Sequence, residues 1–238
     1  LAMRGFFFAQ RCGKSAPPFH TGCHLKDAVQ APSEIDADRQ TILQFPPVYP
    51  AGQFLDVSGG FHDDGHTGKN MSRFPVALDL MLLTADEFNP KLDTDGDGTT
   101  DLVKWLQDAL GLGLKMQDKD GGMFERVLEV KGVRYLDSDK WADVTARWVA
   151  TAAMGAHVLE RRNPHLAAQL EQSALRGWAF ATRNQNQPAR PCLSGCYPEH
   201  PASLFWAAVE LYRLTQEPAY LEAGLKQLPA VIAGELEP

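Results

Sequence analysis

Apolar residues recur at helical spacing through most of the chain after residue 70, and this period limits the possible folds more than any other feature. The first such segment carries Phe74, Ala77, Leu78, Met81 and Leu82. Further helices are predicted over Asp101–Met116, Asp143–Arg161, Pro164–Asn184 and Pro201–Thr215, with another starting at Pro218–Leu225. Because most of these helices follow one another with no strand between them, the pattern predicts an all-α domain.

The connections between these helices are long and carry polar and aromatic residues. A Gly121-Gly122 turn precedes one predicted hairpin, Met123–Val130 against Val133–Leu136. This layout favours a helical toroid whose loops form a cleft on one face. No repeat of 33 or 34 residues is visible, which disfavours a regular solenoid.

Residues 1–58 differ from the rest of the chain. They contain many prolines, including Pro17-Pro18 and Pro46-Pro47, and no sustained helical period. We therefore expect an irregular strap over 1–58 and the helical domain over 59–238.

Composition limits the class of ligand. The formal net charge of −7 argues against nucleic acid and anionic membranes, which require a basic face. No apolar run is long enough to span a bilayer. An acidic balance is compatible with a neutral ligand such as a sugar.

One segment reads Asp56-Val57-Ser58-Gly59-Gly60-Phe61-His62-Asp63-Asp64-Gly65-His66-Thr67-Gly68-Lys69. It resembles a motif of the family 9 glycoside hydrolases. Further similar stretches occur in the same order: Arg11-Cys12-Gly13, Cys23-His24-Leu25-Lys26-Asp27-Ala28, Leu114-Lys115-Met116-Gln117 and Phe205-Trp206-Ala207-Ala208. The resemblance spans nearly the whole chain and implies about half of an (α/α)6 toroid. It also implies that the strap follows an immunoglobulin-like module.

The resemblance implies inverting hydrolysis of β-1,4-glucan. In such reactions one carboxylate activates water while a carboxylic acid protonates the leaving oxygen, the two lying roughly 6.5–9.5 Å apart. By resemblance, Asp63 orients the water. The family's base aspartate corresponds to His66, which departs from the pattern, although histidine can act as a general base near neutral pH. Asp64 adds a carboxylate that the turn could present instead.

The general acid of the family is a glutamate that follows an asparagine, and no Asn-Glu step occurs in this sequence. We therefore expect this chain alone to hydrolyse glucan negligibly. Half a toroid would also leave the inward residues Phe74, Met81, Val149 and Leu204 uncovered. That exposure would favour self-association or pairing with a complementary C-terminal half.

Two cysteine pairs occur in the sequence, and the first lies near histidines. Cys12, Cys23, His24 and His62 offer two thiolates and two imidazoles, the ligands that zinc prefers, and the resemblance implies a structural zinc site. A Cys12–Cys23 disulfide remains the alternative. The other pair, Cys192 and Cys196, is compatible with a local disulfide or free thiols.

A run of alternating acidic residues precedes the second predicted helix. The spacing resembles that of a calcium-binding loop, with oxygen ligands from the side chains of Asp93, Asp95, Asp97 and Asp101 and from the Thr99 carbonyl. The twelfth position holds Lys104 rather than the usual glutamate. The alternative is a solvated acidic turn that caps the next helix.

Most tryptophans lie within predicted helices and are expected in the core, namely Trp105, Trp148, Trp178 and Trp206. Trp141 is the exception, because it follows Tyr135 in a predicted polar loop. Both aromatic residues could contact a sugar ring.

Three functions remain open. The first is an endo-acting β-1,4-glucanase. The second is an exo-acting glycosidase on amino-sugar oligosaccharides, and the third is a noncatalytic relative that binds sugar. The resemblance further implies a secreted or periplasmic protein.

Overall fold

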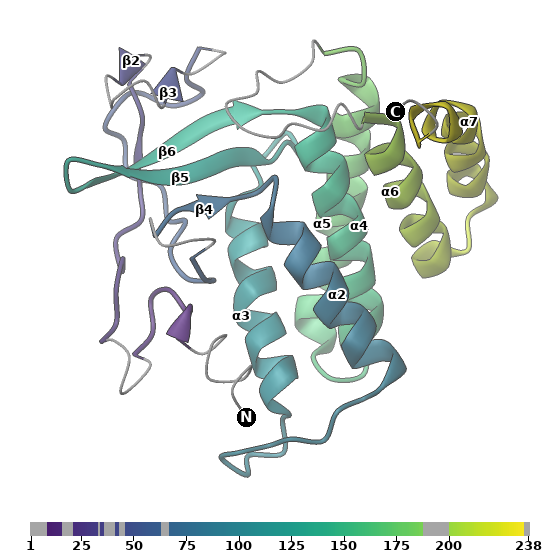
Figure 1. Ribbon diagram of the computed structural model, residues 1–238, viewed down its shortest axis with the longest axis horizontal. Helices are drawn as coiled ribbons and strands as arrows, with labels where there is room; N and C mark the ends of the chain where they lie inside the picture. The colour runs from purple at the N-terminus through teal and green to yellow at the C-terminus, as the bar shows by residue number, and fades with distance from the viewer. Residues whose placement is uncertain are drawn as a thin grey trace. The chain divides into compact units, whose positions relative to one another are not determined.

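The computed structural model describes residues 9–15, 21–32, 34–35, 41–42, 46–62, 67–187 and 200–235. Within these ranges the chain forms six helices and two small sheets (Figure 1). Two compact units divide the chain. Unit 1 comprises Leu1–Met116 and Phe124–Asp139, and unit 2 comprises Gln117–Met123 and Lys140–Pro238.

Unit 1 contains the helices α2 (Phe74–Glu87) and α3 (Asp101–Lys115). Helix α3 begins after Thr100, whose side chain accepts a hydrogen bond from the Val103 amide. The ring of Phe61 stacks on Phe74 and Trp105, with centroids 4.4 and 4.5 Å apart. This aromatic stack fixes the segment before His62 against both helices.

A four-stranded sheet in unit 1 has the order β1-β6-β5-β4. Its strands are β1 (Val29–Gln30), β6 (Val133–Lys140), β5 (Phe124–Val130) and β4 (Lys69–Asn70). Strand β1 runs parallel to β6, and β4 runs antiparallel to β5. The predicted hairpin is confirmed, and its partners come from the strap and from the segment after His62.

The strap is more ordered than its proline content predicts. Besides β1, the short strands β2 (Glu34–Ile35) and β3 (Thr41–Ile42) pair in an antiparallel register. The strap residues lie in unit 1 together with α2 and α3. Pairing with β6 supplies the regular backbone hydrogen bonds that local sequence does not indicate.

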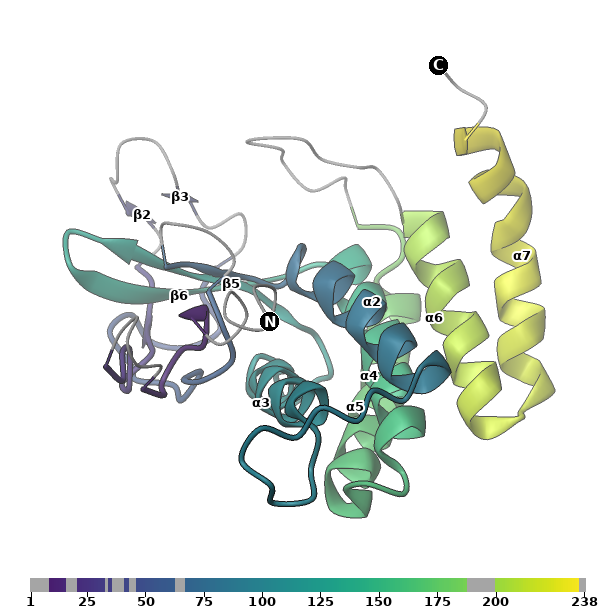
Figure 2. The same ribbon diagram turned by 60° about the horizontal axis from the view of Figure 1, so that its bottom comes forward.

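Unit 2 contains the helices α4 (Ala142–Leu159), α5 (Pro164–Arg183), α6 (His200–Thr215) and α7 (Pro218–Glu235). The alanine-rich α4 is buried along nearly its whole length and packs against α5 and α6. Gly177 of α5 permits this approach, since a Cβ there would lie 2.7 Å from Val149. Helices α6 and α7 lie side by side (Figures 1 and 2).

The helix predicted to start at Pro218–Leu225 is confirmed, and as α7 it continues to Glu235 across Pro229. The structure corrects two other expectations. Trp206 is 39% exposed rather than in the core. Phe74, Val149 and Leu204 are buried, at 2%, 0% and 3% exposure, and Met81 is half-buried. Three of the four apolar residues predicted to be uncovered are therefore covered, and they give no reason for self-association.

No helix among the described residues combines the length and the apolarity needed to cross a bilayer.

Candidate metal centre

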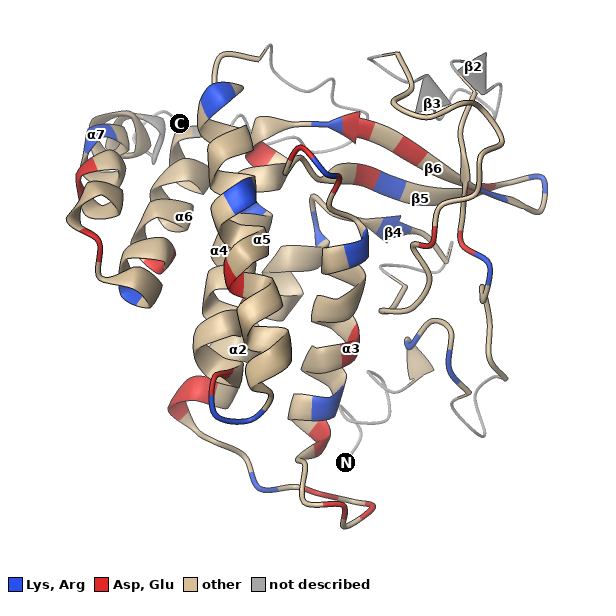
Figure 3. Cartoon of the chain, turned by 180° about the vertical axis from the view of Figure 1, so that it is seen from behind, with Lys and Arg blue, Asp and Glu red and all other residues tan. Residues whose placement is uncertain are grey.

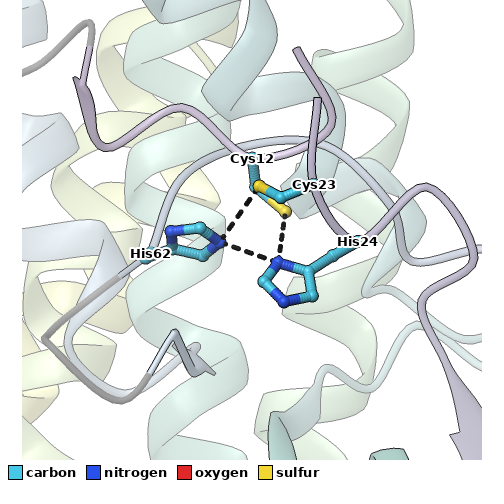
Figure 4. A group of neighbouring side chains, drawn as sticks. All are labelled: Cys12, Cys23, His24 and His62. Carbon is cyan, nitrogen blue, oxygen red and sulfur yellow. Dashed lines mark hydrogen bonds between the residues drawn. The ribbon is translucent and has the colours of Figure 1, made fainter. Parts of the chain in front are cut away.

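Four side chains of metal-binding type point toward one another in unit 1 (Figure 4). They belong to Cys12, Cys23, His24 and His62, and one ligand atom from each lies within 4.8 Å of the others. Cys12 Sγ lies 3.8 Å from His24 Nδ1, and Cys23 Sγ lies 3.8 Å from His62 Nε2. The two imidazole nitrogens, His24 Nδ1 and His62 Nε2, are 3.1 Å apart.

These separations fit the edges of a zinc tetrahedron. Zinc–sulfur bonds of about 2.3 Å and zinc–nitrogen bonds of about 2.0–2.1 Å place sulfur and nitrogen about 3.6 Å apart, and two nitrogens about 3.3 Å apart. The observed distances of 3.8 and 3.1 Å each differ from these values by about 0.2 Å. The residues therefore fit a structural zinc ion in both donor type and geometry.

Backbone hydrogen bonds bring the ligands together from three separate segments. The Cys12 amide donates to the Gly60 carbonyl at 2.8 Å, and the Gly13 amide donates to the Cys23 carbonyl at 2.9 Å. The His62 amide donates to the Gln10 carbonyl at 2.9 Å. The ligand positions are thus set by main-chain pairing, and the side chains need little reorganisation to bind an ion.

Glycine is required at position 60 for this pairing. Its φ of +69° is left-handed, and a Cβ would lie 2.4 Å from the side chain of Leu112 in α3. A larger residue at this position would push the loop away from α3 and disturb the contact with Cys12.

The electrostatic environment favours the metal-binding form of His24. Burial, followed by the nearby Arg134 guanidinium, lowers the pKa of His24, so the ring is held neutral with a lone pair free. Its other nitrogen, Nε2, lies 3.9 Å from Glu129 Oε2. A carboxylate on that side favours the tautomer that leaves Nδ1 facing the cluster. Sequence reasoning did not identify Glu129, because no motif links it to the ligands.

The Cys12 thiol lies in a mixed environment. Burial raises the pKa of Cys12, and the Lys69 ammonium opposes that rise. A nearby positive charge stabilises the thiolate, which is the form that binds zinc.

The predicted catalytic residues Asp63, Asp64 and His66 lie outside the described residues. The residues that flank them in the sequence, His62 and Thr67, are among the residues that the structure describes. His62 belongs to the cysteine–histidine cluster, and Thr67 is held by Arg134.

The two predicted sugar-contacting aromatic residues lie close together in the sequence but in different settings. Trp141 is the single residue between the end of β6 at Lys140 and the start of α4 at Ala142, so it lies in a much shorter connection than predicted. It is only 2% exposed, which favours a packing role. Tyr135 lies half-buried in β6, where it pairs with Val29 of β1.

Acidic residues lie along the loop between α2 and α3 (Figure 3), and three of the predicted ligands are close together in it. Carboxylate oxygens of Asp93, Asp95 and Asp97 converge, and the Lys104 ammonium lies among them. Its Nζ is 3.3 Å from Asp93 Oδ1 and 2.8 Å from Asp97 Oδ1. A protein cation therefore occupies the position where the predicted calcium ion would bind.

Another predicted calcium ligand, Asp101, has a different partner. It accepts hydrogen bonds from the amide and the hydroxyl of Thr94, so its carboxylate lies outside the three-aspartate cluster. At position 99 the amide of Thr99 donates to Asp97 Oδ1 at 2.8 Å, which ties this residue to the cluster. Calcium thus remains a prediction that depends on displacing Lys104.

We expect Lys104→Gln to bind calcium at least tenfold more tightly than the unsubstituted chain, because the ion no longer competes with an ammonium group. Titration calorimetry with calcium chloride at fixed ionic strength measures the difference. Lys26→Gln, at an exposed lysine, is the control and should leave the affinity unchanged. Absence of binding by both Lys104→Gln and the parent would show that the calcium prediction is wrong.

A second electrostatic feature lies near the end of β6. Asp137 is 2% exposed, and burial together with the neighbouring Asp139 raises its pKa to about 6, although Arg126 Nε lies 3.2 Å away. The folded protein therefore retains a proton between about pH 4 and pH 6 that the unfolded chain has released.

The free energy of unfolding should consequently fall as pH rises through this window, by up to about 3 kcal/mol. We expect Asp137→Asn to remove that slope. Urea unfolding at pH 4, 5, 6 and 7 measures it, with Glu160→Gln, an exposed carboxylate replacement, as the control. An unchanged slope in Asp137→Asn would contradict the assignment.

Comparisons with known proteins agree with the motif resemblance. The model of the family described as glycosyl hydrolase family 9 matches residues 2–230. Endoglucanase C of Cellulomonas fimi is 27% identical over 205 residues, which cover 71% of this chain and 18% of that protein.

Solved structures share the fold. A metagenome-derived family 9 endoglucanase superposes with a TM-score of 0.76 at 21% identity, covering 96% of this chain and 45% of that one. A zinc-binding triple mutant of another family 9 endoglucanase gives a TM-score of 0.70 at 24% identity, covering 91% and 45%. The predicted (α/α)6 fold is confirmed, and the chain spans less than half the length of these structures.

Proposed function

Because the chain belongs to glycosyl hydrolase family 9, we propose that it forms part of a glycosidase that hydrolyses β-1,4-glucan with inversion. The observation that carries the proposal is the cysteine–histidine cluster. One of its ligands, His62, directly precedes Asp63, the residue proposed to orient water. The cluster thus anchors one end of the segment proposed to act on water.

The proposed mechanism needs an orienting carboxylate, a base and an acid. Asp63 holds the water by accepting one of its protons in a hydrogen bond. Asp64 or His66 removes the other proton as the water attacks the anomeric carbon from the face opposite the leaving group. A carboxylic acid, by resemblance a glutamate that follows an asparagine and is not found in this sequence, protonates the leaving oxygen as the glycosidic bond breaks. A histidine base would restrict activity to pH values near or above about 6.5, where the imidazole is neutral.

The proposed zinc ion has a structural role. Cys12, Cys23, His24 and His62 would hold it with all four positions filled by protein, which leaves none for water or substrate. An ion bound in this way joins the strap to the segment that ends at His62. Its contribution is to folding rather than to the reaction.

A substrate panel tests the proposal. The natural protein that carries this chain is incubated with soluble β-1,4-glucan, amino-sugar oligosaccharides and a buffer blank, and reducing ends are measured. Release from β-1,4-glucan is the expected result. Release from amino-sugar oligosaccharides alone would favour the exo-acting alternative. Calorimetric binding of cello-oligosaccharides with no release from any substrate would favour a noncatalytic sugar-binding protein.

We also propose that the protein acts outside the cytoplasm, as a secreted or periplasmic protein. The support is the polymeric nature of the proposed substrate, which does not enter cells. Fractionation of the source cells followed by immunodetection tests this location, and recovery only in the cytoplasmic fraction would contradict it.

A further inference from the structure

A buried cluster of charged side chains lies beside the metal centre in unit 1, formed by Asp27, Lys69 and Arg134. Asp27 and Lys69 are both 0% exposed, and the Arg134 side chain is 9% exposed. Burying charges in this way costs free energy unless they are paired and hydrogen-bonded.

The Asp27 carboxylate is the centre of the cluster. It accepts two hydrogen bonds from Arg134, Nε to Oδ1 at 2.8 Å and Nη2 to Oδ2 at 2.9 Å. Lys69 Nζ lies 2.7 Å from the same Oδ2. Burial would raise the pKa of Asp27, but the hydrogen bonds from Arg134 and the charge of Lys69 outweigh it and hold the pKa below its usual value. Asp27 is therefore ionised in the folded protein.

The remaining donors of the cluster bind main-chain carbonyl groups. Lys69 Nζ donates to the Val57 carbonyl at 2.8 Å, and Arg134 Nη1 donates to the Thr67 carbonyl at 2.8 Å. The Val57 amide in turn donates to the Asp27 carbonyl at 2.8 Å. The cluster thus holds the chain at residue 57, before His62, and again at residues 67 and 69, after it.

Simple stabilisation does not require this arrangement. Apolar residues of similar volume often replace a buried ion pair without loss of stability. Here the charged groups fix backbone atoms before and after His62. Fixing the chain on both sides restricts where His62 can lie, and the residues of a functional site must be held within a fraction of an ångström of their working positions.

We propose that Asp27, Lys69 and Arg134 are positioning residues, which fix the backbone at Val57 and at Thr67 and so place His62 for metal binding and, by the proposed function, support catalysis. The inference rests on the proposed function for its catalytic part only. Its effect on backbone order can be measured without any activity.

The test compares Lys69→Met with Lys140→Met in the natural protein that carries this chain. Lys140 is a matched control, because its ammonium is also paired with carboxylates, 2.6 Å from Asp118 Oδ2 and 2.8 Å from Asp120 Oδ2, but holds no residue near His62. Methionine keeps the length of the side chain and removes its charge. Amide hydrogen exchange, kcat and KM are measured for each variant.

In Lys69→Met we expect exchange to become at least tenfold faster within residues 57–69 and to stay unchanged in α4 and α5. The value of kcat should fall about tenfold or more, while KM changes less than twofold. Lys140→Met should show neither effect. If Lys69→Met does not fold, Arg134→Lys, which keeps a charge but loses the bidentate bond, should show the same localised change.

Unchanged exchange in residues 57–69, or equal acceleration throughout the protein, would overturn the proposal. An unsubstituted protein with no hydrolysis would instead contradict the proposed function. The exchange result would still decide whether these three residues fix the segment.

Discussion

Replacing Cys23 by alanine is expected to abolish stoichiometric zinc binding and to lower the melting temperature by about 10 °C or more. Structural zinc contributes directly to folding, and one missing thiolate leaves an incomplete site. At about 3 °C per kcal/mol for a domain of this size, a loss of roughly 3–5 kcal/mol lowers the melting temperature by about 9–15 °C. Elemental analysis and thermal unfolding of the purified protein measure the two effects.

The control for this experiment is Cys196→Ala, which removes a cysteine outside the proposed ligand set. Its zinc content should equal that of the unsubstituted protein. The competing interpretation is a Cys12–Cys23 disulfide. The zinc site would be ruled out if the purified protein lacks stoichiometric zinc and its mass under non-reducing conditions is lower by the two hydrogens that a Cys12–Cys23 disulfide removes.

The second large effect concerns hydrolysis. By resemblance the general acid is a glutamate after an asparagine, and this sequence contains no such step. A missing general catalyst typically lowers the rate by ~10²–10⁴-fold. We therefore expect the 238-residue chain alone to release reducing sugar from soluble β-1,4-glucan at a rate lower by that factor than an enzyme with both catalytic groups.

In the natural protein, Asp63→Ala should lower the rate of hydrolysis by ~10²–10⁴-fold relative to the unsubstituted protein, because the attacking water loses its proposed acceptor. Glu222→Ala, at an exposed carboxylate of α7, is the control and should leave the rate unchanged. Robust turnover by the 238-residue chain that Asp63→Ala abolishes would contradict the expected low rate. It would indicate an acid within these residues, and Glu199 would be the first to replace.

The helices were predictable because their signals are local. Thr100 before Asp101 and Asn163 before Pro164 begin α3 and α5 through side-chain hydrogen bonds that depend only on nearby residues. Pro229 is of a type that normally breaks a helix, yet α7 continues past it to Glu235. Packing of α6 against α7 illustrates how tertiary contacts override such a local preference.

The candidate metal ligands were also predictable, since cysteine and histidine are few in this chain and match a family motif. Their convergence could not be derived from spacing, because the segments that carry Cys12, Cys23 and His62 meet only through backbone hydrogen bonds. Trp141 shows the opposite case. Its polar neighbours predict an exposed loop, whereas the structure buries the ring at the junction of β6 and α4.

By itself the sequence determined the positions of the helices, the hairpin, the family and the residue types of the metal centre. These depend on local period, capping and motif. Only the tertiary structure showed that Lys104 lies among the predicted calcium ligands and that Asp27, Lys69 and Arg134 meet in one buried cluster. The physical reason is that the partner of a charged group is set by distance in the folded chain. Asp27 and Arg134 are 107 positions apart in the sequence, and nothing in the sequence indicates that their side chains are in contact.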